Sequence, residues 1–180
     1  MMDSASLLMV APELVLTVGA LVLLMVAAYA GDRMAKVVSW MSIATLVAAG
    51  LTLLGLPGHG GDAFDGLYRA DAFAAYAKVL IYAAAAASIV VAPRFFAPTA
   101  ANASGALRAE YPILILLACI GMGMMVSAGD MMTLYVGLEL NSLAAYVLAS
   151  FMRQDTRSAE AGLKYFVLGA LASGILLYGI

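Results

Sequence analysis

The sequence predicts an all-α protein, a polytopic transmembrane helical bundle with about six spans. Its 180 residues are 65% hydrophobic and only 11% charged, and its mean hydropathy is +1.02. Soluble domains average about 25% charged and about 45–50% apolar residues, so an ordinary soluble domain is excluded. The apolar residues form segments about 20 residues long, which an α-helix needs to cross a hydrocarbon core about 30 Å thick. A nucleic-acid binder is also excluded, because the basic residues do not cluster.

Six segments have the required length: 7–30, 37–56, 72–92, 111–128, 130–152 and 159–180. The first is expected to be a retained helix, because no basic residue precedes it and Glu13 lies inside it, unlike in a signal peptide. Helix-breaking residues mark the expected ends of the first three spans: 31–33 (GDR), 57–61 (PGHGG), and Pro93 with Pro98, which bracket the exit of the third. Residues 100–108 are expected to form a loop, and 127–130 a tight turn.

Basic residues predict the orientation of these spans. The first, third and fifth loops carry Arg33, Lys36, Arg94, Arg108, Arg153 and Arg157, whereas the second carries only Arg69 and the fourth none. Loops rich in Lys and Arg stay in the cytoplasm, so the odd-numbered loops are expected there and the N-terminus on the outer side. The sequence has one cysteine, Cys119, and one histidine, His59, so neither an internal disulfide nor a metal site is expected.

Ionisable side chains inside a span are costly and mark functional candidates, and Glu139 is the strongest of four. A helix that begins near Asp130 places Glu139 ~13 Å below the outer surface. Its helical neighbours Tyr135, Ser142 and Tyr146 complete a polar stripe, which is expected to face away from lipid. A carboxyl group there suits reversible proton binding. The alternative is a protonated glutamate that only hydrogen-bonds between helices.

The other three candidates are Lys164, Lys78 and Glu13. Lys164 is expected about one and a half turns into the last span, with Ser158 as N-cap and Glu160 in the first turn. A proton-transfer role and a surface pair with Glu160, with the lysine reaching water, both remain open. Lys78 is expected to extend to the outer surface and Glu13 to lie in a first turn near that surface. Structural roles are favoured for these two.

Three stretches containing these residues resemble a known family: 134–143 (LYVGLELNSL), 160–170 (EAGLKYFVLGA) and 177–180 (LYGI). They are similar to the antiporter-like membrane subunits of proton-pumping NADH:quinone oxidoreductase, or respiratory complex I, and specifically to the N-type subunits. Residues 11–13 (APE) and 67–73 (LYRADAF) resemble those of alphaproteobacteria. The resemblance covers essentially the whole chain.

The resemblance implies proton translocation coupled to quinone reduction in a bacterial inner membrane, with a periplasmic N-terminus. Glu139 and Lys164 match the family's proton-transfer glutamate and lysine, and Lys78 matches a less regular lysine. No cofactor is expected in this chain: NADH, FMN, iron–sulphur clusters and quinone would bind other subunits. The expected partners are the other membrane subunits and the lipid bilayer, with no nucleic acid.

Members of this family are much longer and contain inverted repeats, so the resemblance implies an N-terminal fragment. Residues 1–110 would then hold the first three helices with their loops, and 111–180 the start of the proton-translocating module. Two alternatives remain: a subunit of a multisubunit cation/proton antiporter, and a structural membrane subunit whose buried charges only fix helix packing.

Overall fold

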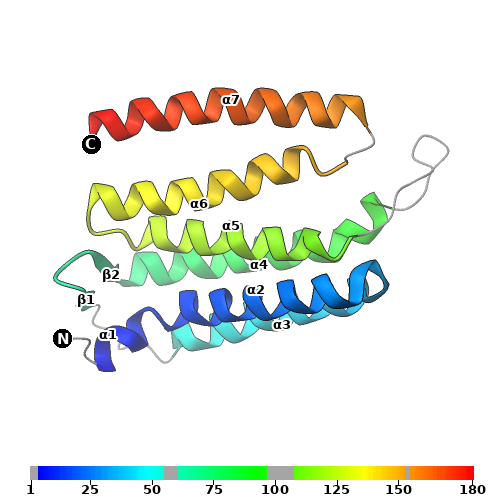
Figure 1. Cartoon of the computed structure of the whole chain (residues 1–180). Coiled ribbons are helices and arrows are strands. Elements are labelled where there is room, and N and C mark those ends of the chain that lie inside the picture. The colour runs from blue at the N-terminus through cyan, green and yellow to red at the C-terminus, as the bar shows by residue number, and fades with distance from the viewer. Residues whose placement is uncertain (1–3, 55–60, 97–107, 153–154) are drawn as a thin grey trace.

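The computed structural model describes residues 4–54, 61–96, 108–152 and 155–180, and six long helices run back and forth through it (Figure 1). These are α2 (Ala11–Ala30), α3 (Ala35–Leu54), α4 (Ala72–Phe95), α5 (Glu110–Val126), α6 (Met131–Ala149) and α7 (Thr156–Gly179). The predicted all-α bundle is confirmed, and each predicted span corresponds to one helix. Of the predicted connections, 57–60, 97–107 and Arg153 lie outside the described residues.

The first predicted span begins later than expected. A short helix, α1 (Ser4–Met9), precedes it, and α2 starts at Ala11 with Pro12 in its first turn, where the missing N–H of proline costs no hydrogen bond. A 3₁₀ turn, η1 (Gly31–Met34), then joins α2 to α3. Gly31 has φ +63°, a conformation that glycine adopts without a steric penalty, and the chain reverses there.

Two further helix boundaries differ from prediction. Pro93 does not end α4, which continues to Phe95. Helix α7 begins at Thr156, because Asp155 rather than Ser158 is its N-cap and accepts a hydrogen bond from the Arg157 N–H at 2.9 Å. The Ser158 hydroxyl instead donates to the Ala149 carbonyl at 2.9 Å and ties the start of α7 to the end of α6. Helix α6 begins next to Asp130, as predicted, and the Asp130 side chain caps it by accepting a hydrogen bond from the Thr133 N–H at 3.2 Å.

A small hairpin covers one end of the bundle (Figure 1). Strands β1 (Gly61–Ala63) and β2 (Tyr68–Ala70) pair antiparallel, with Asp62 opposite Arg69. The hairpin is hydrogen-bonded to the turn between α5 and α6, since the Arg69 N–H donates to the Ser127 carbonyl at 2.7 Å and the Gly129 N–H donates to the Leu67 carbonyl at 2.9 Å. The hairpin was not predicted from the sequence.

Helix α5 lies at the centre of the packing and contacts α2, α3, α4 and α6. Its buried residues, including Ile113, Leu116 and Cys119, belong to a core shared with Leu16, Leu23, Val38 and Ile89 of the neighbouring helices. A Cβ added at Gly121 would lie 2.6 Å from both the Asn141 nitrogen and the Gly137 oxygen. Small residues therefore bring α5 and α6 into close backbone contact, as is common between membrane helices.

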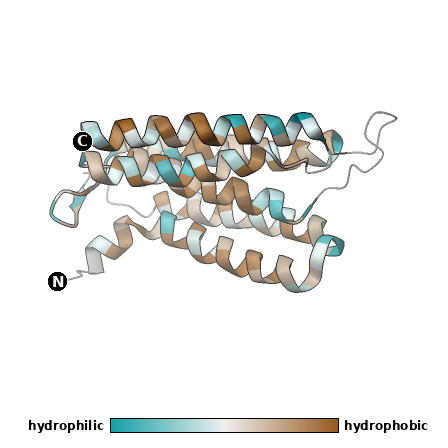
Figure 2. Ribbon diagram, turned by 45° about the horizontal axis from the view of Figure 1, so that its top comes forward, coloured by the Kyte–Doolittle hydropathy of each residue, from teal (hydrophilic) through white to brown (hydrophobic). Residues whose placement is uncertain are grey.

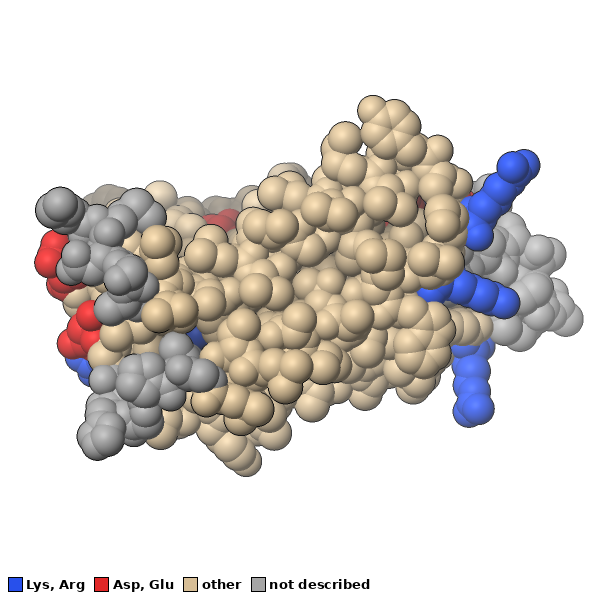
Figure 3. Space-filling model, turned by 90° about the horizontal axis from the view of Figure 1, so that it is seen from below, with Lys and Arg blue, Asp and Glu red and all other residues tan. Residues whose placement is uncertain are grey.

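The outer surface has an apolar belt between two charged ends. Figure 2 shows hydrophobic residues along the middle of the helices, and in Figure 3 most visible Lys and Arg gather at one end and Asp and Glu at the other. Large apolar side chains such as Trp40, Leu51 and Leu171 are exposed on this belt. Exposure on this scale fits contact with lipid, and the chain is a multi-pass membrane protein.

Candidate functional site

The structure brings two of the four candidate ionisable groups together and keeps the other two apart. Glu13 of α2 and Lys78 of α4 form a buried ion pair, with Lys78 Nζ 2.6 Å from Glu13 Oε1. Lys78 is 2% exposed and Glu13 5% exposed. The prediction that Lys78 extends to the outer surface is therefore wrong. Glu13 lies in the first turn of α2, as predicted, but its side chain is turned into the protein.

Tyr68 of strand β2 completes this buried cluster, which we call the Glu13–Tyr68–Lys78 triad. Lys78 Nζ donates a hydrogen bond to the Tyr68 hydroxyl at 2.6 Å, and that hydroxyl donates to Glu13 Oε2 at 2.8 Å. The ammonium also lies 4.9 Å from the centre of the Tyr68 ring, within cation–π range. Every member of the triad therefore has a polar partner, as buried polar groups require.

Local structure explains why these three side chains meet. Asp71 caps α4 by accepting a hydrogen bond from the Ala74 N–H at 2.7 Å, which fixes the start of α4 about two turns before Lys78. Strand β2 of the hairpin places the Tyr68 hydroxyl next to the Lys78 ammonium group. Gly123 of α5 leaves space for the carboxylate, because a Cβ there would lie 3.0 Å from Glu13 Oε1. The sequence suggested only an interfacial position for Tyr68 and not its contact with Glu13 and Lys78, since nothing local links it to two charges on different helices.

Burial governs the protonation of Tyr68, which lies outside the spanning helices. Burial in an apolar site, followed by the negative charge of Glu13, raises the pKa of the Tyr68 hydroxyl above its ordinary value. The hydroxyl therefore keeps its proton at physiological pH. In this state it can accept a hydrogen bond from Lys78 and donate one to Glu13 at the same time.

Glu139 lies in α6 with one carboxyl oxygen, Oε1, buried and without a hydrogen-bond partner among the described residues. Gly137, two residues or about 200° away on the helix, faces α5, so Glu139 lies on the side of α6 turned away from α5. Tyr146 of the same predicted stripe is buried against α7, with its ring centre 4.8 Å from that of Tyr165. The stripe thus runs beside the contact between α6 and α7.

Lys164 pairs with Glu160 at 2.6 Å, and both side chains are largely exposed. The predicted surface pair is confirmed, although α7 begins at Thr156, so Glu160 lies beyond the first turn and Lys164 about two turns into the helix. Gly162 is buried against Ser150 of α6, and Lys164 lies about 200° away from it on the helix. Lys164 therefore faces away from α6, and the described part of the chain does not bring it to Glu139.

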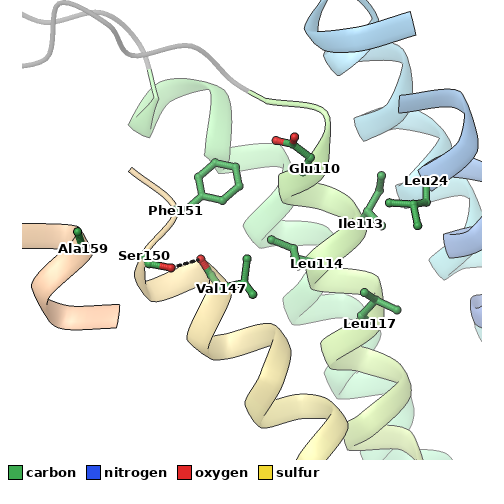
Figure 4. Close-up of a pocket in the computed structure, with 9 residues that line it drawn as sticks. All are labelled: Leu24, Glu110, Ile113, Leu114, Leu117, Val147, Ser150, Phe151 and Ala159. Carbon is green, nitrogen blue, oxygen red and sulfur yellow. Dashed lines mark hydrogen bonds between the residues drawn. The ribbon is translucent and has the colours of Figure 1, made fainter. Parts of the chain in front are cut away.

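A cavity of about 500 Å³ opens at the basic end of the bundle, between α2, α5, α6 and the start of α7 (Figure 4). Its lining is mostly apolar, with two polar exceptions, Glu110 and Ser150. Glu110 Oε2 is buried without a hydrogen-bond partner among the described residues, whereas the Ser150 hydroxyl donates to the Val147 carbonyl at 3.3 Å. Val147 lies eight residues, or ~12 Å, along α6 from Glu139. Sequence reasoning did not single out Glu110, because it lies at a helix start, where acidic residues are common.

The described residues contain no group of three or more His, Cys, Asp or Glu side chains that could hold a metal ion. Their polar chemistry consists of carboxyl, ammonium and hydroxyl groups within apolar helices. Such groups exchange protons and form ion pairs. Intramembrane ionisable residues of this kind mark proton relays and ion pathways.

Comparisons with known proteins agree with this chemistry. Residues 128–180 match the family described as "NADH:quinone oxidoreductase/Mrp antiporter, TM". The chain is 67% identical over 98% of its length to NADH-quinone oxidoreductase subunit N of Rhizorhabdus wittichii, and 55% and 56% identical over 98% of its length to those of Erythrobacter litoralis and Sphingopyxis alaskensis. It covers 36% of each of these relatives, so it spans about a third of their length.

A solved structure, respiratory complex I from Thermus thermophilus with bound aureothin, contains a chain of the same fold. The TM-score is 0.74 at 27% identity, and the match covers 93% of this chain and 35% of that one. Together, these similarities confirm the resemblance inferred from the sequence.

Proposed function

We propose that this chain, a homologue of the N-terminal part of NADH-quinone oxidoreductase subunit N, forms part of a membrane subunit of a proton-pumping NADH:quinone oxidoreductase. In that role it provides part of a proton pathway driven by quinone reduction elsewhere in the complex. The observation that carries the proposal is the 67% identity to a subunit N over 98% of the chain. The buried, unpartnered Glu139 carboxyl oxygen supports it independently.

Glu139 is the central proton-binding group in this proposal. Protons enter from the basic end, where the cavity with Glu110 opens toward α6. The Glu139 carboxylate, ~12 Å along α6 from Val147 of the cavity lining, takes up a proton that has entered through the cavity and later releases it to the next group. Lys164 is a further proton-transfer group once additional helices cover the exposed face of α7, and Lys78 is a third within the triad.

The remaining assignments follow from the same proposal. The basic end faces the cytoplasm of a bacterium, and the N-terminus lies on the periplasmic side of the inner membrane, as the distribution of Lys and Arg favours. Residues 111–180 begin the proton-translocating module, and residues 1–110 form the helices before it. NADH, FMN, iron–sulphur clusters and quinone bind to partner subunits, which contact this chain within the bilayer.

The test uses Glu139→Gln in the full-length subunit within its complex, with inside-out membrane vesicles and NADH as the fuel. Glutamine keeps the shape of the side chain but has no carboxyl group to bind and release a proton. We expect proton uptake per NADH oxidised to fall severalfold, while the complex still assembles. The matched control is Asp62→Asn, an exposed carboxylate of the hairpin that pairs with Arg69, which should pump like the wild type. Wild-type pumping by Glu139→Gln refutes the role of Glu139.

A second candidate function is that of a multisubunit cation/proton antiporter, because the matched family includes the Mrp antiporters. Deletion of the gene distinguishes the two functions. Loss of NADH-linked quinone reduction supports the oxidoreductase, whereas loss of sodium tolerance with normal NADH oxidation supports the antiporter. A purely structural subunit predicts full activity after Glu139 and Lys164 are neutralised together.

A further inference from the structure

We propose that the Glu13–Tyr68–Lys78 triad is a second proton-transfer site, in which the Tyr68 hydroxyl passes a proton between the Lys78 ammonium and the Glu13 carboxylate. The inference rests on the proposed function in one respect, namely that the protein moves protons. It assigns roles to Glu13 and Tyr68. It also places Lys78 in a site separate from that of Glu139.

The hydrogen bonds of the triad run in one direction. Lys78 Nζ donates to the Tyr68 hydroxyl at 2.6 Å, and this hydroxyl donates to Glu13 Oε2 at 2.8 Å. When the Tyr68 proton moves to Glu13, a Lys78 proton replaces it on the hydroxyl oxygen. The products are a neutral amine and a neutral carboxylic acid, and tyrosine is restored. Net charge is conserved, and the reverse step restores the ion pair.

Further polar atoms around the triad lack partners among the described residues. Glu13 Oε1 makes only the ion contact with Lys78, and the Ser127 hydroxyl and the Tyr82 hydroxyl are buried without a hydrogen bond. Tyr82 lies one turn beyond Lys78 on α4, and Ser127 lies at the end of α5 beside the hairpin. Buried polar atoms of this kind are usually satisfied by ordered water. Water bound there would let protons enter or leave the triad from the hairpin end.

The triad and Glu139 lie on different sides of α5. Glu13 contacts α5 at Gly123, and α6 contacts it at Gly121. Two residues correspond to about 200° on a helix, so these contacts are on opposite faces of α5. Glu139 lies on the face of α6 that is turned away from α5. The triad and Glu139 are therefore separated by α5 and α6 and exchange protons with different neighbouring groups.

The charges themselves favour proton transfer over packing. A buried ion pair is often no more stable than well-packed apolar residues of similar size, so helix packing alone does not require one. The triad adds a bridging hydroxyl in direct contact with both charged groups. An apolar replacement would preserve packing and remove every exchangeable proton, which separates the two roles experimentally.

Two variants of the full-length subunit in its complex test the proposal. Glu13→Leu/Lys78→Met replaces both charges by apolar side chains, and Tyr68→Phe removes only the bridging hydroxyl. The matched control is Asp62→Asn/Arg69→Gln, which neutralises the exposed ion pair of the same hairpin. Proton uptake and NADH oxidation are measured in inside-out vesicles, with the amount of assembled complex determined for each variant.

We expect both triad variants to assemble and to lower the rate of proton uptake severalfold, a modest loss beside the 10²–10⁴-fold rate contribution typical of one positioned proton-transfer group. The control should match the wild type. Wild-type uptake in either assembled triad variant overturns the proposal. If the double variant fails to assemble, Tyr68→Phe alone decides, since its ring and both charges remain.

Glu139→Gln in the same vesicles distinguishes the role of the triad from the role of Glu139. Loss of pumping in Glu139→Gln with normal pumping in the triad variants leaves the proposed function intact and refutes the second site. Loss in the triad variants with normal pumping in Glu139→Gln supports the triad and removes the role of Glu139. Normal pumping in all of them refutes both.

Discussion

Removing one partner of the buried Glu13–Lys78 pair should destabilise the protein far more than removing both. At 2.6 Å, and with an effective dielectric constant of 20, the attraction between the two charges is about 6 kcal/mol, most of which offsets their desolvation. Glu13→Leu leaves an ammonium group that is 2% exposed without its counter-charge. We expect a loss of about 3–5 kcal/mol in the free energy of unfolding.

The double variant Glu13→Leu/Lys78→Met should recover most of this loss, because no isolated charge remains in the core. Thermal unfolding of the purified full-length subunit in detergent, measured for the wild type, both single variants and the double variant, completes a double-mutant cycle. We expect the double variant to be more stable than either single variant. This prediction is contradicted if the losses in the free energy of unfolding of the two single variants add up to that of the double variant, or if Glu13→Leu loses less than about 1 kcal/mol.

Three further predictions concern other contacts. Gly121→Leu should lower the free energy of unfolding by about 1–3 kcal/mol, because the leucine side chain would enter the contact with Gly137. Thermal unfolding in detergent measures this loss, and an unchanged midpoint contradicts it. Folding raises the pKa of Tyr68 from an ordinary value of 10.0, so the stabilisation that the protonated hydroxyl provides should be complete below pH 10 and decline at higher pH. Unfolding measured over a pH series should show this decline in the wild type and not in Tyr68→Phe. Glu160→Gln should change stability by less than about 1 kcal/mol, because its pair with Lys164 is exposed; a larger loss would indicate a buried pair.

The spans were predictable because hydropathy depends on local composition alone. The start of α6 was predictable because residues 127–130 break the apolar run just before Asp130, where the helix begins. At the start of α7, Asp155 and Ser158 are both suitable caps. Ser158 is drawn instead to the Ala149 carbonyl of α6, a tertiary contact that a local pattern does not contain.

The candidate site was predictable only in part, and the reason is geometric. The Glu160–Lys164 pair follows from i,i+4 spacing on one helix and is confirmed. The Glu13–Lys78 pair joins helices whose adjacency is set by packing around α5, and each residue alone fits a position near the membrane surface. Tyr68 joins them only because a hairpin folds over the bundle end. The roles of Glu139 and Lys164 in proton transfer stay predictions.

The close backbone contact between α5 and α6 has a consequence for leakage. A membrane that stores energy as a proton gradient is short-circuited by any continuous file of water through its proteins. At Gly121 there is no space even for a methyl group, so no water can lie between α5 and α6 at that level. The contact between Gly121 and Gly137 therefore blocks proton transfer through water at this level between the triad beside α2 and Glu139 on the far side of α6.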